Sequence, residues 1–153
     1  MASEKIGIIG YGVVGKAAGA TFSKSYELII YDKYLDQDKF ALLSEADMVF
    51  VMVPTPFDYH SQTSDDSAIR ETLDLLESIS FDSKKPVVIK STIVPESCEF
   101  YSSNYDLEIV FNPEFLREST SPFEDFANQK TVVIGTESET AYRKVKEIYE
   151  KVL

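Results

Sequence analysis

Three glycines near the N-terminus have the spacing of a phosphate-binding loop. Gly10, Gly12 and Gly15 form a Gly-x-Gly-x-x-Gly pattern directly after a short apolar run. The first glycine permits a tight turn off a strand, the second lets a pyrophosphate approach the backbone, and the third lets the next helix pack closely. Unpaired N–H groups and the helix dipole then favour an anion at the helix N-terminus. The pattern predicts a dinucleotide-binding loop; the alternative is a glycine-rich turn of another α/β protein.

A carboxylate follows the second apolar run, where such a loop requires it. Residues 27–31 have the composition of a strand and end at Asp32, which lies about twenty residues beyond the first glycine. An acidic side chain there accepts hydrogen bonds from the adenosine ribose hydroxyls and repels a 2′-phosphate. The loop and Asp32 together predict NAD rather than NADP. The alternative is that Asp32 is a turn residue at the end of a strand.

Apolar runs alternate with helix-like segments along the whole chain, joined by short links. Strands are expected at 6–9, 27–31, 48–53, 87–90, 108–111 and 131–134. Helices are expected after Gly15, up to about residue 43, over 67–79, over 95–103 and at the C-terminus, with 57–65 as a polar loop. This alternation predicts an α/β fold with a doubly wound, six-stranded parallel sheet, a Rossmann fold, in one domain. Ligands bind beyond the carboxyl ends of such strands.

The C-terminal helix has an apolar stripe and a candidate start signal. The residues expected to be buried on it are Tyr142, Val145, Ile148, Tyr149 and Val152. Thr136 and Glu139 have the spacing of a capping box, which predicts where the helix begins.

Composition narrows the class of function. The net charge of −11 over 153 residues disfavours nucleic acids and anionic membrane surfaces as partners. The single cysteine, Cys98, cannot form an internal disulfide, which favours a reducing, cytoplasmic location. The single histidine, His60, cannot supply a histidine-rich metal site, so no metal is expected. Apolar stretches stay shorter than the ~20 residues of a membrane span.

Four motifs at the expected strand ends resemble those of one enzyme family. In chain order they are Gly10-x-Gly12-x-x-Gly15, Val53-Pro54-Thr55-Pro56, Lys90-Ser91-Thr92-Ile93-Val94-Pro95 and Asn112-Pro113-Glu114-Phe115-Leu116-Arg117-Glu118. Together they resemble the NAD-binding N-terminal domain of the UDP-glucose/GDP-mannose dehydrogenases. The resemblance implies a role in oxidising the primary alcohol of a nucleotide sugar to a carboxylate with NAD.

By this resemblance, the cofactor contacts fall on the first loop and on the ends of three strands. The loop positions beside the pyrophosphate are Gly10, Gly12, Val13, Val14 and Gly15. Asp32 would bind the ribose, assisted by Lys33 or Lys39, between which the resemblance does not decide. Thr55 and Thr92 would line the cofactor, although both also suit strand-end caps.

The resemblance places the chemistry on the last motif. Glu114 matches a carboxylate that handles water or a proton, Glu118 matches a residue near the nicotinamide, and Thr92 completes the catalytic set. The residues whose backbone would face the sugar are Phe115, Leu116 and Arg117. In a helix, Glu114 and Glu118 would share one face, and two close carboxylates separate each other's pKa values, which suits proton transfer. The alternative is a pair of solvent-exposed carboxylates at a helix start.

The sequence departs from the family in ways that bear on activity. The family continues with a central helix and a C-terminal substrate domain carrying a nucleophilic cysteine, and both are expected to be absent from residues 1–153. Cys98 lies beside carboxylates that would raise its pKa, which suits a structural thiol. Glu96 falls near a family glycine.

Three functions therefore remain open. The chain is expected to bind NAD but not to oxidise a nucleotide sugar alone, and so to need a separate substrate domain. The first alternative is a stand-alone NAD-binding module. The second is a hydroxy-acid dehydrogenase, which Thr92 and residues 112–118 disfavour. A homo-oligomer remains open as well.

Overall fold

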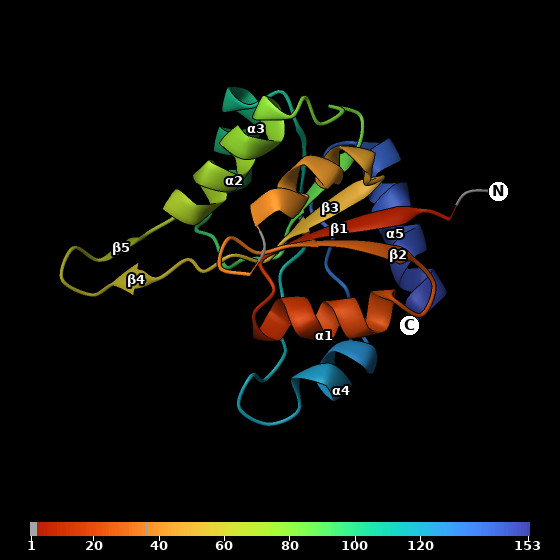
Figure 1. Cartoon of the computed structure of the whole chain (residues 1–153). Coiled ribbons are helices and arrows are strands. Elements are labelled where there is room, and N and C mark those ends of the chain that lie inside the picture. The colour runs from red at the N-terminus through yellow and green to blue at the C-terminus, as the bar shows by residue number, and fades with distance from the viewer. Residues whose placement is uncertain (1–2, 36) are drawn as a thin grey trace.

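A five-stranded parallel sheet forms the centre of the molecule, with strand order β2-β1-β3-β6-β7. The computed structural model describes residues 3–35 and 37–153. The strands of the sheet are β1 (Lys5–Ile9), β2 (Glu27–Tyr31), β3 (Met48–Val51), β6 (Pro86–Ile89) and β7 (Glu108–Phe111). A small antiparallel hairpin, β4 (Phe57–Asp58) and β5 (Thr63–Ser64), projects from one side of the body (Figure 1). This arrangement confirms the predicted doubly wound α/β fold.

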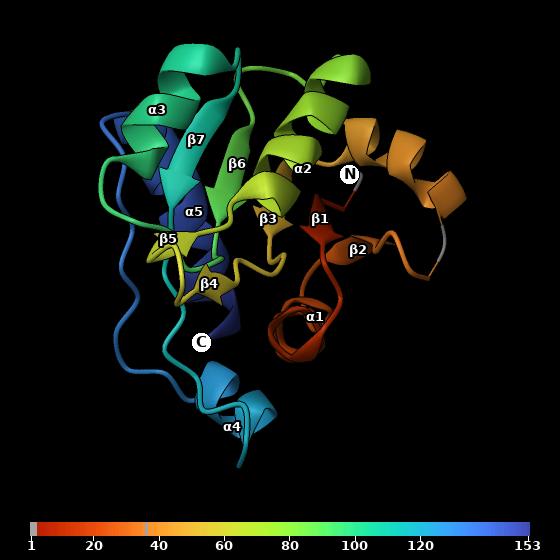
Figure 2. The same ribbon diagram turned by 90° about the vertical axis from the view of Figure 1, so that its left-hand side faces the viewer.

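Helices cover both faces of the sheet, which gives three layers and two cores. The helices are α1 (Val13–Phe22), the 3₁₀ helix η1 (Gln37–Glu45), α2 (Ser67–Ser78), α3 (Ser97–Asn104), α4 (Pro122–Ala127) and α5 (Glu139–Val152). One core packs α1, α4 and α5 on one face of the sheet, and the other packs η1, α2 and α3 on the opposite face (Figure 2). All four residues of β3 and of β6 are buried, as expected for strands covered on both faces.

The predicted sixth strand at 131–134 is wrong. Residues 131–134 form no strand, and the adjoining Gly135 meets the sheet edge through an isolated antiparallel bridge with Phe111. The Asn112 side chain donates a hydrogen bond to the Val133 carbonyl at 2.8 Å, so a side chain occupies an acceptor that a neighbouring strand would use. The preceding segment folds into α4, which the sequence analysis did not predict. β-branched residues supplied the propensity of a strand, but tertiary contacts decided the pairing.

Two local expectations for α5 are also wrong. Its N-cap is Ser138, whose hydroxyl accepts a hydrogen bond from the Ala141 amide, whereas Thr136 accepts from the Ser138 amide one turn earlier. Tyr142 is 39% exposed, and Ala141 takes its place in the buried stripe. The polar loop expected at 57–65 contains the β4–β5 hairpin. None of the described helices is long and apolar enough to cross a membrane.

Candidate functional site

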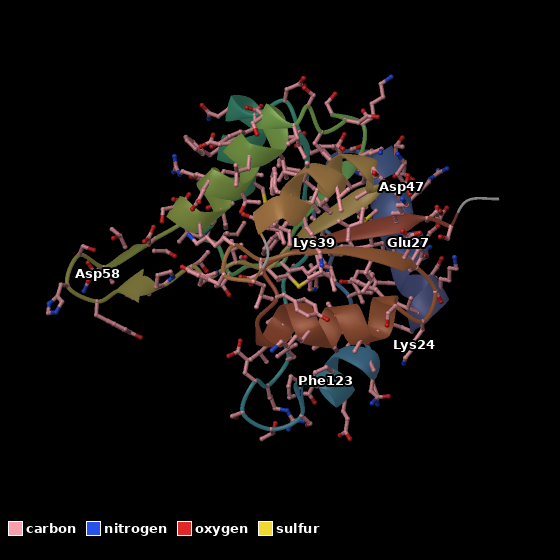
Figure 3. All side chains as sticks on the ribbon, in the orientation of Figure 1. Lys24, Glu27, Lys39, Asp47, Asp58 and Phe123 are labelled. Carbon is pink, nitrogen blue, oxygen red and sulfur yellow. The ribbon has the colours of Figure 1, made fainter. Side chains whose placement is uncertain are left out.

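The segments singled out by the sequence gather at the carboxyl edge of the sheet. Because all five strands run parallel, the loops after β1, β2, β3, β6 and β7 leave from the same edge. The β4–β5 hairpin, marked by Asp58, also extends from this side, whereas Asp47 lies at the opposite edge (Figure 3). The site divides into a part over β1 and β2, a central part over β3 and β6, and a part over β6 and β7.

The glycine loop after β1 has one open position and two closed ones. Gly10 has φ +90°, and a Cβ there would meet the Met52 carbonyl. A Cβ on Gly15 would meet the Gly10 carbonyl oxygen. A Cβ on Gly12, in contrast, would have nothing within 4 Å. Gly10 and Gly15 therefore serve the backbone itself, while Gly12 leaves space in front of the helix.

The N-terminus of α1 is suited to a phosphate. Its N-cap is Gly12, and among the described residues no side chain caps it and no acidic residue lies in its first turn. The first amides of a helix lack intrahelical partners, so here they remain available to an anion. Val13 is exposed at this end, and Val14 is half-buried against the core. The open space at Gly12 and the uncapped amides fit the pyrophosphate of NAD.

Asp32 lies directly beside this loop, as the spacing predicts. Its Oδ2 accepts a hydrogen bond from the Tyr11 amide at 2.8 Å, and its Oδ1 accepts one from the Tyr34 amide at 2.9 Å. The carboxylate thus joins the glycine loop to the end of β2. A carboxylate has about four lone-pair positions, so both oxygens can still accept from a ribose.

A cavity of about 230 Å³ opens between the glycine loop and α2. Gly10, Asp32 and Lys33 line it, together with Pro54 and Glu71. Lys33 Nζ lies 3.3 Å from Glu71 Oε2, and this hydrogen bond raises the pKa of Lys33. Of the two candidate lysines, Lys33 lines the cavity, whereas Lys39 belongs to η1.

The central part brings the two candidate threonines together. Thr55 follows β3 and Thr92 follows β6, and the Thr55 hydroxyl donates to the Thr92 carbonyl at 2.6 Å. The Ser91 hydroxyl donates to the Val53 carbonyl at 2.7 Å and adds a second link between the same loops. Thr92 is exposed and lines a hollow of about 350 Å³. The Thr55 hydroxyl thus links the two loops, and Thr92 is the more exposed of the two threonines.

A buried polar cluster forms the third part, and sequence reasoning missed most of it. Lys90 directly follows β6, and its side chain is 1% exposed. Its Nζ donates to Asn112 Oδ1 at 3.1 Å and to the Tyr149 hydroxyl at 3.2 Å, and it lies 3.0 Å from Glu114 Oε2. The Tyr149 hydroxyl also donates to Asn112 Oδ1. The cluster of Lys90, Asn112, Glu114 and Tyr149 thus joins β6, the loop after β7 and α5.

Burial sets the protonation of this cluster. Removal from water lowers the pKa of Lys90, and the neighbouring Glu114 carboxylate opposes that shift. Burial also raises the pKa of Tyr149 well above its usual value, and the Glu114 charge adds to the rise. Tyr149 is therefore a neutral donor at physiological pH.

The segment 112–118 is not helical, which corrects the expectation for its two glutamates. Glu114 and Glu118 do not share a helical face, and Glu118 is exposed in a turn. Glu114 Oε1 instead accepts from the Phe115 and Leu116 amides at 2.9 and 3.1 Å. The Glu114 side chain thus binds the two amides that directly follow it in the chain.

The three residues expected to face a sugar with their backbone use their amides internally. Phe115 and Leu116 donate to Glu114, and the Arg117 amide donates to Asp125 Oδ2 at 3.0 Å. Arg117 also pairs with Asp125 through its guanidinium, which lowers the pKa of Asp125 to about 2. Of the three, Phe115 has the side chain that is left for a ligand, since it is exposed, whereas Arg117 is paired and Leu116 packs against the core.

Cys98 has the character predicted for it. It is half-buried in α3, and burial together with the Glu99 charge raises its pKa to about 11. A thiol with this pKa is almost entirely protonated at neutral pH and is a poor nucleophile.

Comparisons with known proteins give a consistent result. Residues 35–153 match the family described as UDP-glucose/GDP-mannose dehydrogenase family, NAD binding domain. The chain is 34% identical over 113 residues to a UDP-glucose 6-dehydrogenase of Rickettsia felis, covering 67% of this chain and 24% of that protein. It is 29% identical over 136 residues to the UDP-glucose 6-dehydrogenase AglM of Haloferax volcanii, covering 78% of this chain and 28% of that protein. The matched region thus spans about a quarter of these relatives.

Solved structures share the fold. The GDP-mannose dehydrogenase from Pseudomonas aeruginosa superposes with a TM-score of 0.82 at 20% identity, covering 96% of this chain and 44% of that one. The UDP-glucose dehydrogenase from Pyrobaculum islandicum superposes with a TM-score of 0.76 at 19% identity, covering 99% of this chain and 45% of that one. The family match begins at residue 35, so the glycine loop and Asp32 are assigned by their geometry.

Proposed function

Because the chain belongs to the UDP-glucose/GDP-mannose dehydrogenase family as an NAD-binding domain, we propose that it is the cofactor half of a nucleotide-sugar 6-dehydrogenase. The observation that carries this proposal is the uncapped N-terminus of α1 with open space at Gly12, directly beside Asp32. When bound, NAD supplies the hydride acceptor for oxidation of an alcohol. Everything else at the carboxyl edge has to orient the two reactants.

The part over β1 and β2 is proposed to hold the dinucleotide. The amides that open α1, with Val13 and Val14, take the pyrophosphate, and Asp32 accepts from the ribose hydroxyls. Lys33 lines the same cavity and, through its pair with Glu71, reduces the local negative charge. These assignments favour NAD over NADP because a 2′-phosphate would face the Asp32 carboxylate.

The part over β6 and β7 is proposed to meet the nucleotide sugar. Glu114 handles a proton or water, and Thr92 acts from the loop after β6, where it is exposed and lines a separate hollow. Glu118 has a proposed place near the nicotinamide, at the turn that ends this loop. The residues that would border the sugar are Phe115, Leu116 and Arg117, and Phe115 is 70% exposed.

Complete oxidation is proposed to require a separate substrate domain, with residues 1–153 forming one cofactor domain. Cys98 does not fill the role of a nucleophile because it is half-buried with a raised pKa. A cytoplasmic location is proposed with this role, since the cofactor is an intracellular dinucleotide. The role is compatible with a homo-oligomer.

Isothermal titration of the chain with NAD⁺, NADH, NADP⁺ and UDP-glucose tests the proposal. We expect saturable binding of NAD⁺ and NADH, weaker binding of NADP⁺, and no reduction of NAD⁺ when UDP-glucose is added to the chain alone. The matched control is Gly12→Val, which fills the open space without touching the fold. A flat titration at millimolar NADH, or equal binding by Gly12→Val, would contradict the assigned cofactor site.

Turnover distinguishes an enzyme part from a stand-alone binding module. Adding a substrate domain from a relative, as a separate polypeptide, should restore NAD⁺ reduction with UDP-glucose. Reduction of NAD⁺ by the chain alone would contradict the need for a second domain. Cofactor binding without any reconstituted turnover would favour a stand-alone NAD-binding module.

A further inference from the structure

Lys90 is a buried charge that the cofactor site does not use. Its side chain is 1% exposed at the end of β6. The rings of Phe126 and Tyr149 lie 5.4 and 5.8 Å from its Nζ, and Asn112 supplies two oxygens at 3.1 and 3.4 Å. Burying an ammonium is costly unless it is paired. Its placement therefore calls for an explanation in terms of what it pairs with.

The two oxygens of Glu114 are held in different ways. Oε1 accepts from the Phe115 and Leu116 amides. Oε2 is buried, has no aligned hydrogen bond among the described residues, and lies 3.0 Å from Lys90 Nζ. The Glu114 side chain as a whole is 12% exposed, compared with 1% for Lys90. The backbone thus fixes one oxygen, and the Lys90 charge alone balances the other.

The remaining groups around the pair are neutral. Tyr149 from α5 is protonated, because burial and the Glu114 charge raise its pKa. Asn112 from the loop after β7 and Phe126 from α4 carry no charge. Among the described residues, Glu114 is the charged group that acts on the pKa of Lys90. Lys90 is therefore the charged group of the cluster that faces Glu114.

We propose that Lys90 is a positioning residue for Glu114: its buried ammonium holds the carboxylate at the carboxyl edge of the sheet and balances its charge where the carboxylate would accept a proton. The catalytic use of that proton rests on the proposed function, whereas the control of Glu114 by Lys90 does not. The chemical step assigned to Glu114 is a reversible proton transfer: an O–H bond of the donor, water or the substrate alcohol, breaks as an O–H bond forms on the carboxylate, and the donor oxygen keeps the electron pair.

A purely structural role would have a different consequence. Buried ion pairs often contribute little to stability, and apolar replacements of both partners are often tolerated. If Lys90 only fills space and satisfies Asn112, its removal changes stability but leaves the titration of Glu114 where it was. If Lys90 balances the carboxylate, its removal raises the pKa of Glu114, because a buried carboxylate without a cation favours the protonated form.

The experiment is a pH titration of the Glu114 side-chain carbonyl carbon by ¹³C NMR, in the chain and in Lys90→Met. Methionine keeps an unbranched side chain and removes the charge. We expect the Glu114 midpoint to rise by about 1 unit or more in the variant. The matched control is Lys85→Met at the opposite end of β6, whose Nζ donates to the Ala46 carbonyl. An unchanged Glu114 midpoint in folded Lys90→Met would overturn the proposal.

A second measurement covers a variant that does not fold. In the unaltered chain, the ¹³Cε resonance of Lys90 should shift at the same pH midpoint as the Glu114 carbonyl carbon. Independent midpoints would overturn the coupling. NADH titration of the same samples keeps the two questions apart, because absent NADH binding contradicts the proposed function and leaves the Glu114 midpoint readable.

Discussion

The two outer parts of the site, over β1 and β2 and over β6 and β7, are the two ends of the carboxyl edge, and they are formed by different chemical groups. Over β1 and β2, the site consists of backbone amides, glycines and one carboxylate that faces an open cavity. Over β6 and β7, it consists of long side chains buried beneath the surface, with Lys90 and Glu114 paired at 3.0 Å. The part over β1 and β2 has free amides and open space for a ligand because side chains are missing there. The part over β6 and β7 is held in place by hydrogen bonds and an ion pair between buried side chains.

Substitutions in the glycine loop should therefore change either NAD binding or stability, depending on the position. Substitutions in the buried cluster should change stability. At the glycine loop, neighbouring positions have opposite roles, since one is open and another is closed. In the buried cluster, every member contacts at least one other member, so single changes affect the whole.

The largest expected effect separates two glycines of the loop. Gly15→Val should abolish the cooperative fold, because its side chain would overlap the Gly10 carbonyl, and such buried overlaps cost about 4 kcal/mol or more. Gly12→Val should melt like the unaltered chain but bind NADH about 100-fold more weakly, equivalent to about 3 kcal/mol. Circular dichroism melting and NADH titration measure both. Similar melting of the two variants would remove the distinction between open and closed positions.

A smaller loss is expected at the carboxylate of the same end. Asp32→Ala should weaken NADH binding by about 10- to 100-fold, because hydrogen bonds to a charged group contribute about 1.5–3 kcal/mol. The matched control is Asp47→Ala at the opposite edge, since Asp47 Oδ2 also accepts a backbone amide, from Lys5, at 2.9 Å. Titration calorimetry should find a loss in the first variant alone. Equal losses in both would assign the effect to stability.

At the buried end, a single hydroxyl should affect stability without affecting the cofactor. Tyr149→Phe removes the donor to Asn112 and an acceptor of Lys90, at a cost of about 1 kcal/mol. The melting temperature should fall, and the NADH affinity should stay within error. A weaker NADH affinity in this variant would mean that the two ends of the edge are coupled more closely than their contacts indicate.

The smallest effect concerns backbone strain, and it has the opposite sign. Glu96, at the start of α3, has a positive φ of 68°, which is unfavourable for a residue with a side chain. In the glycine loop, the residue with positive φ is a glycine, Gly10. Glu96→Gly should stabilise the chain by about 1 kcal/mol, the approximate cost of that conformation for a residue with a side chain. Urea unfolding measures the gain. A loss of stability would indicate that the Glu96 side chain compensates for its own strain.

Sequence reasoning reached the first end because its signals are local. Gly10, Gly12, Gly15 and Asp32 lie within one strand–helix–strand unit, so their spacing along the chain is enough to identify them. The five sheet strands could be predicted for the same reason, from continuous apolar runs. The predicted strand at 131–134 failed because its pairing depends on the distant Asn112 side chain.

The buried cluster could not be predicted from local patterns. Lys90 lies at the end of an apolar run. From the sequence alone, such a lysine is equally consistent with a strand end that leaves the core and exposes its charge to solvent. Tyr149 fits the apolar stripe of α5 and was predicted to be buried, but nothing in the stripe indicates that its hydroxyl meets a lysine 59 residues earlier. A lysine directly after three buried β-branched residues is the signal that could have drawn attention to this point.

The double use of Asp32 has a consequence for how a dinucleotide is received. Because its carboxylate already accepts a hydrogen bond from the Tyr11 amide, the glycine loop has its binding conformation before the dinucleotide binds. The loop then loses little conformational entropy on binding, because the ligand does not have to order it. Slow amide exchange at Tyr11 in the ligand-free protein would be the signature of this preorganisation.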